Sequence, residues 1–315
     1  MGKKLLSVVT GSFNEEGSVD EWFERVFSQL EQMSQYDWEI VWVDNASQDG
    51  TKQKVKQWCQ KDKRVKLIVN ARNFGPIRSP FHGLMETKGA AAIYLASDLQ
   101  DPPELIASFV KEFEAGFDVV AGVYKNSVDN WLMARCRRLY YYVMRAVSEA
   151  KTIKAFTGFG LYSRRVLELL RSNGGPMPFV KGLVAEYGLP TATVAYDKER
   201  RKYGVSKNDV LGLVDQALLG ITSMSRAPIR FATLMGMAMS TLGFLIALGY
   251  LMAKLVFWYS FPMGQAPLLI GIFLFASVQI LVVGLIGEYI ASMHLRMQNQ
   301  PWVVELERVN FENEP

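Results

Sequence analysis

The residues best suited to chemistry form a short acidic loop, Asp98-Leu99-Gln100-Asp101, directly before two prolines. Carboxylate and amide oxygens are hard ligands that suit Mg²⁺ or Mn²⁺, and these ions bind through one or two carboxylates plus phosphate oxygens. Asp98, Gln100 and Asp101 are therefore candidates to hold a cation that neutralises a diphosphate group. Because an Asp-x-x-Asp pattern before prolines is also typical of helix capping, the loop alone leaves both interpretations open.

Polar residues also follow other predicted strands, where a nucleotide would bind. Asp44 ends one strand and is placed to accept hydrogen bonds from a ribose or a base, and Asn14 and Glu15 follow the first strand. Asn73 and Gly75 are typical of a tight turn that lets the backbone approach a ligand. A turn with an N-terminal helix cap is the alternative for Asn14 and Glu15, and it does not exclude ligand contact.

The elements that position these loops are short apolar strands separated by helical stretches. Strands that are apolar on both faces are typical of a mostly parallel, doubly wound α/β sheet, in which ligands bind beyond the carboxyl ends of the strands. Ser18 and Glu21 form a capping-box pattern, and Pro102 and Pro103 precede a predicted helix from Glu104 to Ala115. The predicted strands are Leu5 to Thr10, Trp38 to Asp44, Val65 to Asn70, Ala91 to Ala96 and Asp118 to Val123.

The C-terminal part of the chain is strongly apolar. Phe231 to Ala253 contains no charge, and at ~1.5 Å per residue it would span roughly 34 Å, enough to cross the hydrocarbon of a bilayer. A second span is predicted from about Leu268 to Glu288. Basic residues flank the outer ends of this pair of spans, which predicts a multi-pass cytoplasmic (inner) membrane protein with both termini and the catalytic domain in the cytoplasm. A buried core hairpin is the alternative.

Two amphipathic stretches precede the apolar spans. The first runs near Asn130 to Ser148 and the second near Lys207 to Met224. Both patterns fit helices that lie along a membrane surface, and ordinary helices that cover the sheet are the alternative.

Composition argues against several other classes of protein. The net charge of +4 is modest and no basic run resembles a nucleic-acid arm, so a nucleic-acid partner is not expected. Cys59 and Cys136 stand far apart without a paired-cysteine motif, which indicates neither a disulfide framework nor a zinc site. A reducing cytoplasm is the compartment that this cysteine usage favours.

Taken together, these motifs resemble the family-2 glycosyltransferases of the polyprenyl-phosphate hexosyl type, similar to bactoprenol glucosyltransferases and dolichyl-phosphate mannose synthases. The resemblance covers nearly the whole chain. It rests on Ser12-Phe13-Asn14-Glu15-Glu16, the Asp44 loop, Arg72-Asn73-Phe74-Gly75, Asp98-Leu99-Gln100-Asp101-Pro102-Pro103-Glu104, Tyr203-Gly204-Val205-Ser206-Lys207 and Gly287-Glu288-Tyr289-Ile290.

The resemblance implies a GT-A fold and an inverting transfer of a sugar from a nucleoside-diphosphate sugar, UDP-glucose or a related UDP-sugar, to a polyprenyl phosphate with Mg²⁺ or Mn²⁺. The expected nucleotide-binding residues are Phe13, Asn14, Glu15, Asp44, Asn73, Gly75 and Asp98, and the expected metal ligands are Asp98 and Gln100. The expected catalytic residues are Asp98, Asp101, Arg201 and Lys207. Binding two phosphates also requires cations, and Lys125, Arg135 and Arg138 are the candidates for the acceptor phosphate, with a solvated surface charge as the alternative for each.

The chain departs from the family pattern at a few positions. The family often has Pro where Gly11 stands and Asp where Ala96 stands, so metal coordination would rest on Asp98 and Gln100. The family also commonly has Asp and Arg where Gly158 and Gly160 stand. Two other functions therefore stay open: a tethered transferase that acts on a glycan, and a catalytically weakened scaffold that binds nucleotide sugars.

These expectations divide the chain into four parts. They are a GT-A catalytic domain at 1–206, a juxtamembrane amphipathic helix at 207–228, a two-helix transmembrane anchor at 229–296 and a cytoplasmic C-terminal tail at 297–315. The expected partners are the nucleotide-sugar donor, the polyprenyl phosphate and the bilayer. Self-association as a homo-oligomer is expected too, because two helices per chain give little intramembrane packing.

Overall fold

The computed structural model describes residues 2–125, 153, 156–173, 180–199, 202, 227–256, 265–297 and 301–311. Its strands are β1 (Lys4–Ser12), β2 (Tyr36–Asp44), β3 (Val65–Asn70), β4 (Ala91–Tyr94), β5 (Val119–Tyr124), β6 (Phe156–Ser163), β7 (Thr191–Tyr196) and β8 (Glu305–Val309). Its helices are α1 (Val19–Glu31), α2 (Thr51–Lys61), α3 (Gly75–Met85), the 3₁₀ turn η1 (Pro103–Leu105), α4 (Ile106–Glu114), α6 (Arg164–Asn173), α7 (Val180–Tyr187), α9 (Ala227–Val256) and α10 (Gln265–Met297).

The described strands form one mixed sheet in the order β7-β5-β6-β4-β1-β2-β3-β8. β1 pairs in parallel with β2 and β4, β2 with β3, and β5 with β7. β6 runs antiparallel between β4 and β5, so it begins at the edge where those two strands end. We call this side of the sheet the carboxyl edge, and it is where the loops singled out in the sequence come together.

The five predicted strands are confirmed, and so is the α/β fold class. β4 ends at Tyr94 rather than at Ala96, which frees the residues after it to form the acidic loop. The predicted capping box is wrong: Ser18 does cap α1, but its hydroxyl donates to the Glu15 carbonyl at 2.9 Å and no side-chain cap bond forms. The hydroxyl therefore stabilises the turn before α1 instead of the first turn of the helix.

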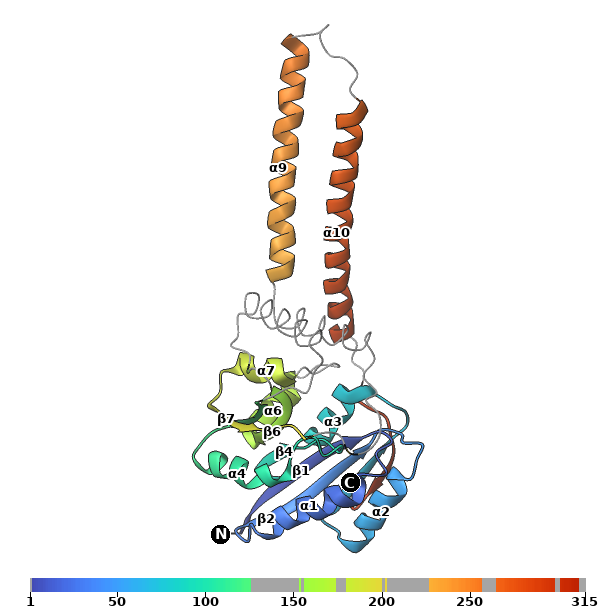
Figure 1. The fold of residues 1–315 in the computed structure, drawn as a ribbon, viewed down its shortest axis with the longest axis vertical. Helices are drawn as coiled ribbons and strands as arrows, with labels where there is room; N and C mark the ends of the chain where they lie inside the picture. Colours follow the sequence, from blue (N-terminus) through green and yellow to red (C-terminus); the bar gives the residue numbers. More distant parts are fainter. Residues whose placement is uncertain are drawn as a thin grey trace.

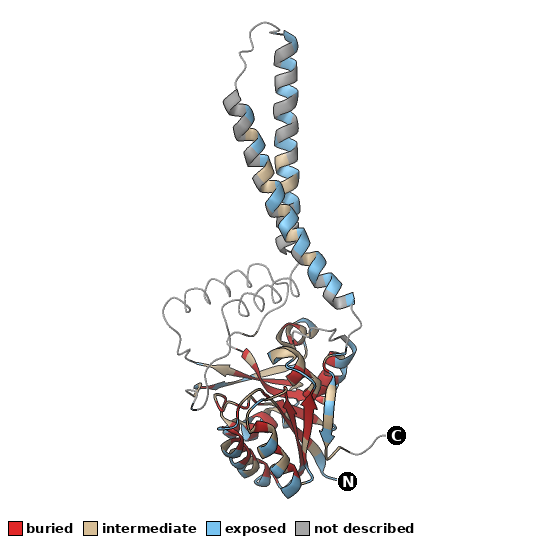
Figure 2. Cartoon of the chain, turned by 90° about the vertical axis from the view of Figure 1, so that its right-hand side faces the viewer, coloured by how far each residue is buried: buried red, intermediate tan, exposed pale blue. Residues whose placement is uncertain are grey.

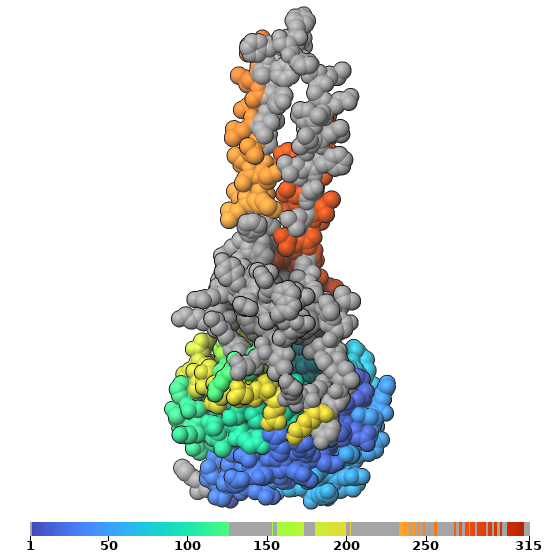
Figure 3. All heavy atoms as spheres, viewed as in Figure 1, coloured from blue at the N-terminus to red at the C-terminus, as the bar shows by residue number. Residues whose placement is uncertain are grey.

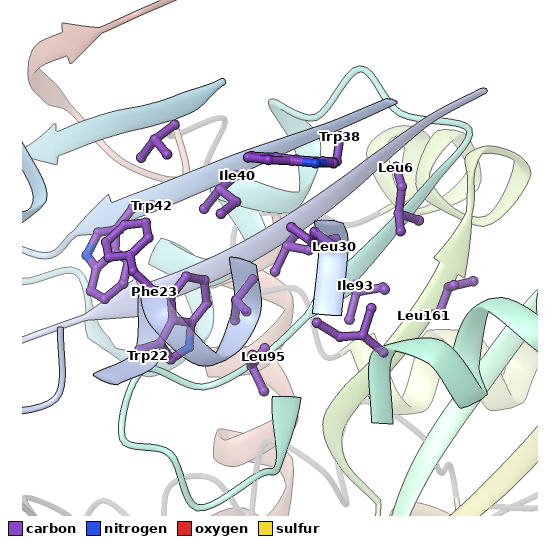
Figure 4. Packing of buried hydrophobic residues seen from close by; sticks show 14 of the residues in the cluster. Leu6, Trp22, Phe23, Leu30, Trp38, Ile40, Trp42, Ile93, Leu95 and Leu161 are labelled. Atoms are coloured by element: carbon purple, nitrogen blue, oxygen red, sulfur yellow. The ribbon is translucent and has the colours of Figure 1, made fainter. Parts of the chain in front are cut away.

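Two apolar cores hold the sheet between its helices. Buried residues of α1, α2 and α4 pack on one face, and those of α3, α6 and α7 pack on the other (Figure 1). In the first core Trp22 of α1 meets Trp42 of β2 edge-on at 5.0 Å between ring centroids, and Phe23 stacks on Trp42 at 5.1 Å (Figure 4). Such fully buried aromatic contacts fix α1 against β2, close to the carboxyl edge.

α9 and α10 run side by side away from the α/β domain (Figures 1 and 3). Their described residues are mostly exposed or half-buried, whereas the sheet is buried throughout its centre (Figure 2). Over the residues that the structure describes, no helix is both long enough and apolar enough to cross a membrane. The amphipathic stretches at 130–148 and 207–224 lie outside the described residues.

The segment after α10 returns to the sheet, a feature that the sequence analysis did not predict. Within the expected tail, β8 pairs antiparallel with β3, and the Ala71 N–H donates to the Val304 carbonyl at 2.8 Å. Arg78 of α3 donates to the carbonyl of Trp302 at 2.7 Å, and the Trp302 ring packs on Phe81. The end of α10 is thereby joined to both β3 and α3.

A charged contact reinforces this return. The His82 ring nitrogen Nε2 lies 2.5 Å from a carboxylate oxygen of Glu305, and Arg308 bonds the same carboxylate. Burial alone would raise the pKa of Glu305, but the bonds from His82 and Arg308 outweigh it and lower that pKa to about 2. A depressed carboxyl pKa means that the folded state prefers the ionised form.

This pair predicts an acid-sensitive contribution to stability. Because the folded pKa of Glu305 is below its ordinary value, its contribution is present above about pH 4.5 and is lost as the pH falls towards 2. We expect Glu305→Gln to lower the melting temperature at pH 7 by about 2–4 °C, a loss of ~1 kcal/mol after solvent screening, and to flatten the acid limb of the stability curve. Thermal unfolding of the full chain between pH 3 and 7 checks this prediction, with Glu307→Gln as the control for the loss of one negative charge. Identical acid limbs of the stability curve for Glu305→Gln and for the parent protein would contradict it.

Candidate functional site

Asn45 joins the loop after β2 to the ends of β1 and β3 and to the loop after β3. Its backbone N–H donates to the Ser12 carbonyl at 2.9 Å, and its side-chain Nδ2 donates to Oδ1 of Asn73 at 2.8 Å. Its Oδ1 accepts bonds from Asn70 at 3.0 Å and from the Phe74 N–H at 2.9 Å. Asn45 is only 4% exposed, and these bonds fix the loop after β2 relative to the ends of β1 and β3 and to the loop after β3.

The loop after β1 is tied to the loop after β2. Asn14 has a left-handed backbone with φ of 56°, its N–H donates to the Ser47 hydroxyl at 2.9 Å, and its Oδ1 accepts from the Gln48 N–H at 2.7 Å. The buried Glu15 donates its N–H to the Thr51 hydroxyl at 2.9 Å. Asn tolerates this backbone region better than most residues, which explains its place at the turn. Asn14 and Glu15 thus serve the turn that the sequence suggested as an alternative role.

Asp44 is fully buried at the end of β2. One of its carboxylate oxygens accepts the Ser47 N–H at 3.0 Å, whereas the other, Oδ1, has no hydrogen-bond donor within the described part of the chain. Burial raises the pKa of Asp44, and the bonds from Ser47 only partly oppose it. A buried carboxylate oxygen without a donor is costly, so this position favours a ligand that brings its own O–H or N–H.

The acidic loop after β4 is anchored at its start. The Trp22 indole N–H donates to the Ala96 carbonyl at 3.1 Å, and the Ser97 hydroxyl donates to the Gly11 carbonyl at 3.1 Å. Leu99 has φ of 56° and a buried side chain, so the turn is held in a conformation that leucine rarely adopts. This turn leaves Asp98 half-buried, with its Oδ1 accepting the Gln100 N–H at 3.2 Å.

Asp101 differs from Asp98 in its surroundings. It is 4% exposed, and its carboxylate accepts a short hydrogen bond from the Tyr196 hydroxyl at the end of β7. Burial raises the pKa of Asp101, and the Tyr196 bond partly opposes that rise. Asp101 therefore ties the acidic loop to β7, while Asp98 is the acid of this loop that is open to a ligand.

The acidic loop fits a divalent cation of the expected kind. Mg²⁺ and Mn²⁺ need only one or two carboxylates when phosphate oxygens complete their coordination, and Asp98 with the half-buried Gln100 offers that set. No group of three or more His, Cys, Asp or Glu side chains that could enclose a metal occurs among the described residues. The loop is thus suited to a cation shared with a ligand rather than to one caged by protein alone.

Two departures from the family pattern have a structural reason. A Cβ on Gly160 would lie 2.3 Å from the Val120 carbonyl oxygen, so no larger residue fits β6 there without a backbone shift. Gly158 has φ of 105°, which strains any L side chain. A Cβ at Gly158 would meet Tyr94 at 3.9 Å and Cε of Lys181 at 4.0 Å, which places Lys181 at the carboxyl edge.

The other predicted site residues are placed as follows. Phe13 is half-buried after β1, Asn73 is exposed, and Gly75 opens α3 with φ of 84°, as a tight turn requires. Lys125 is exposed at the end of β5, where its N–H donates to the Tyr196 carbonyl at 2.8 Å. Arg135, Arg138, Arg201 and Lys207 lie outside the described residues.

Sequence reasoning missed Asn45, Tyr196 and Lys181. Asn45 stands directly after Asp44, so a search for buried amides beside strand ends would have found it. Tyr196 and Lys181 belong to β7 and α7, neither of which was predicted, and their proximity to the acidic loop depends on the order of strands in the sheet.

The amide of Asn45 gives a direct test of the carboxyl edge. Asn45→Asp keeps the shape but sets a carboxylate oxygen against Oδ1 of Asn73, so we expect a loss of ~1–3 kcal/mol in stability and at least about tenfold weaker nucleotide binding. Calorimetric titration with UDP and thermal unfolding measure both. Gln60→Glu on the exposed face of α2 adds the same charge elsewhere and is expected to change neither. Unchanged UDP affinity in Asn45→Asp would contradict this role for Asn45.

The chain is similar to known proteins over most of its length. The model of the family described as Glycosyl transferase family 2 matches residues 7–170. The SfII prophage-derived bactoprenol glucosyl transferase of Shigella flexneri is 30% identical over 94% of this chain and 96% of its own length. The uncharacterized glycosyltransferase YkcC of Bacillus subtilis is 29% identical over 98% of this chain and 95% of its own.

Solved structures share the fold. The mannosyltransferase PcManGT from Pyrobaculum calidifontis, in complex with GDP-Man and Mn²⁺, aligns with a TM-score of 0.50 at 19% identity over 95% of this chain and 89% of its own. Glucosyl-3-phosphoglycerate synthase from Mycobacterium tuberculosis, with Mn²⁺, UDP and phosphoglyceric acid, aligns with a TM-score of 0.51 at 16% identity over 70% of this chain and 76% of its own. With the sheet and the acidic loop placed as described, the family match and the full-length relatives show that this chain belongs to glycosyl transferase family 2.

Proposed function

We propose that this family-2 glycosyltransferase moves glucose from UDP-glucose, or a related UDP-sugar, to a polyprenyl phosphate with inversion at the anomeric carbon. The observation that carries the proposal is the arrangement of two carboxylates along one edge: Asp44, buried with an oxygen that has no described donor, and Asp98, half-buried on the acidic loop. The bactoprenol glucosyl transferases of similar length support the choice of sugar and lipid.

The acceptor supplies its own nucleophile in this reaction. A phosphate monoester has its second pKa near ~6, so at neutral pH the lipid phosphate is already largely the dianion and needs little help from a general base. Its oxygen attacks the anomeric carbon while the bond to the nucleoside diphosphate breaks on the opposite face. The task of the protein is therefore to position two phosphates and to offset their charge.

Each part of the carboxyl edge has a role in that task. Asp44 would accept a hydrogen bond from the ribose or the base, and the loops joined by Asn45 would hold the nucleotide. Asp98 and Gln100 would hold Mg²⁺ or Mn²⁺, which neutralises the departing diphosphate when it is bound. Asp101, bound to Tyr196, keeps the acidic loop in place.

We propose further that α9 and α10 hold the enzyme at the cytoplasmic face of the inner membrane. The sequence from 231 to 253 is uncharged, and a long polyprenyl tail favours the bilayer by ~0.8 kcal/mol per buried CH₂. An apolar surface as extended as this one is typical of membrane or protein contact. Large apolar side chains exposed on these helices are Leu234, Met237, Leu242, Leu245, Leu248, Met252, Leu255, Val256, Leu268, Ile272, Phe275, Ile280, Val283, Ile286, Ile290, Met293 and Met297. Self-association stays a prediction.

Replacement of Asp98 tests the proposed reaction. We expect the parent protein, given UDP-glucose, Mn²⁺ and polyprenyl phosphate, to form lipid-linked glucose, and Asp98→Asn to lower kcat by at least about 100-fold because a charged ligand to the diphosphate-bound cation is lost. Asp37→Asn, exposed at the start of β2 on the opposite edge, makes the same chemical change away from the site and is expected to keep full activity.

The same assay separates the other functions. A parent protein that binds UDP yet makes no lipid-linked sugar with any donor would favour the scaffold function suggested by Ala96 and Gly158. Transfer to a glycan but not to polyprenyl phosphate would favour a tethered glycan transferase. Either outcome would overturn the proposed reaction.

A further inference from the structure

Lys181 is a cation of the carboxyl edge to which the proposed reaction has so far given no role. It lies in the first turn of α7, which packs on β6, and its Cε reaches to 4.0 Å from where a Gly158 Cβ would stand. Gly158 is near the start of β6, and β6 pairs with β4 on one side and β5 on the other. The ammonium group of Lys181 thus approaches the acidic loop from the β6 side of the sheet.

The neighbours of Lys181 leave its charge incompletely matched. Among the groups that shift its pKa, the acidic one is Asp101, which is itself buried and bonded to Tyr196. Within the residues that the structure describes, no carboxylate forms an ion pair with Lys181, and Lys198 adds a second positive charge nearby. Burial lowers the pKa of Lys181, Lys198 lowers it further, and Asp101 opposes both. A half-buried cation whose charge is not matched by neighbouring carboxylates is stabilised when it binds an anionic ligand.

The order of the strands places Lys181 away from the nucleotide loops. Asp44 and Asn45 follow β2, Asn73 follows β3, and Asp98 follows β4. Since the sheet runs β6-β4-β1-β2-β3, Lys181 lies on the far side of the acidic loop from those nucleotide-binding residues. A donor whose base lies at β2 and whose diphosphate lies at Asp98 would leave the β6 side for the second substrate.

Gly158 has no side chain that could compete for the ammonium group of Lys181. Its backbone at φ of 105° is held by the Tyr162 hydroxyl, which donates to the Gly158 carbonyl at 2.7 Å. A carboxylate at this position would stand beside Lys181 and neutralise it. Glycine leaves the ammonium group available to another anion.

We infer that Lys181 binds the phosphate of the acceptor at the start of β6 and so holds the nucleophile next to the donor. This inference rests on the proposed function for the identity of the acceptor. Its contact is an ammonium to a phosphate dianion, a charge-assisted hydrogen bond that also offsets the charge of a second phosphate close to the diphosphate. Lys181 would make this contact together with the cations expected from sequence, rather than in place of them.

Direct binding tests the inference without turnover. We expect Lys181→Met in the full chain to weaken binding of farnesyl phosphate, a soluble short-chain isoprenyl phosphate, by about 10- to 100-fold, and to leave UDP affinity within about twofold. Lys181→Arg keeps the charge and is expected to retain most of the affinity. Farnesol, which lacks the phosphate, should bind the parent and Lys181→Met equally well. Lys111→Met, exposed on α4, is the matched control and is expected to change none of these affinities.

Kinetics give a second, separable measurement. With polyprenyl phosphate as the varied substrate, Lys181→Met should raise KM for the acceptor by at least about tenfold while KM for UDP-glucose stays unchanged. An equal loss of UDP affinity would overturn the inference in favour of a donor-phosphate contact, and unchanged farnesyl phosphate affinity would overturn it outright. If the parent turns over no polyprenyl phosphate, the proposed function fails, but the binding measurements still decide whether Lys181 contacts an isoprenyl phosphate.

Discussion

The buried amide of Asn45 is the contact on which the rest of the carboxyl edge depends. Parallel strands end side by side, but nothing in their ladder bonds fixes the loops beyond them. Asn45 supplies that restraint, since its two donors and its acceptor reach the last residues of β1 and β3 and the loop after β3 at 2.8–3.0 Å. Because it is buried, each bond is stronger than it would be in water and each would be costly to lose.

The first half of the sheet was predictable because its strands carry a strong signal. β1 to β5 are apolar and buried on both faces, so their composition alone separates them from the helices between. β6 contains two glycines, β7 is half-exposed, and β8 reads Glu-Leu-Glu-Arg-Val, so none of them shows that pattern. Each of these strands forms because it pairs with a neighbouring strand in the sheet. Pairing between segments far apart in the sequence cannot be predicted from local composition.

Individual residues of the candidate site could be predicted from the sequence, but their arrangement in space could not. Asp44, Asp98 and Gly75 were found because strand ends, acidic loops and glycine turns have local signatures. The different environments of Asp98 and Asp101 were not, because they depend on Tyr196, which lies far along the chain on β7. The link between Lys181 and Gly158 likewise needs α7 folded onto β6. Local sequence therefore identifies the acids at the strand ends, and tertiary structure decides how far each of them is buried.

The two glycines of β6 affect both the packing of the sheet and the charge at the carboxyl edge. Gly160 is required because the Val120 carbonyl would clash with any side chain, so an arginine cannot stand there in this sheet. Against the family pattern, glycine at 158 and alanine at 96 remove two negative charges and glycine at 160 removes one positive charge, a net gain of one positive charge at the edge. In the proposed reaction two phosphates meet at this edge, and their mutual repulsion is the main electrostatic cost. Fewer carboxylates there reduce that cost, so the loss of Asp at 96 and 158 is compatible with catalysis provided that Asp98 keeps its place on the acidic loop.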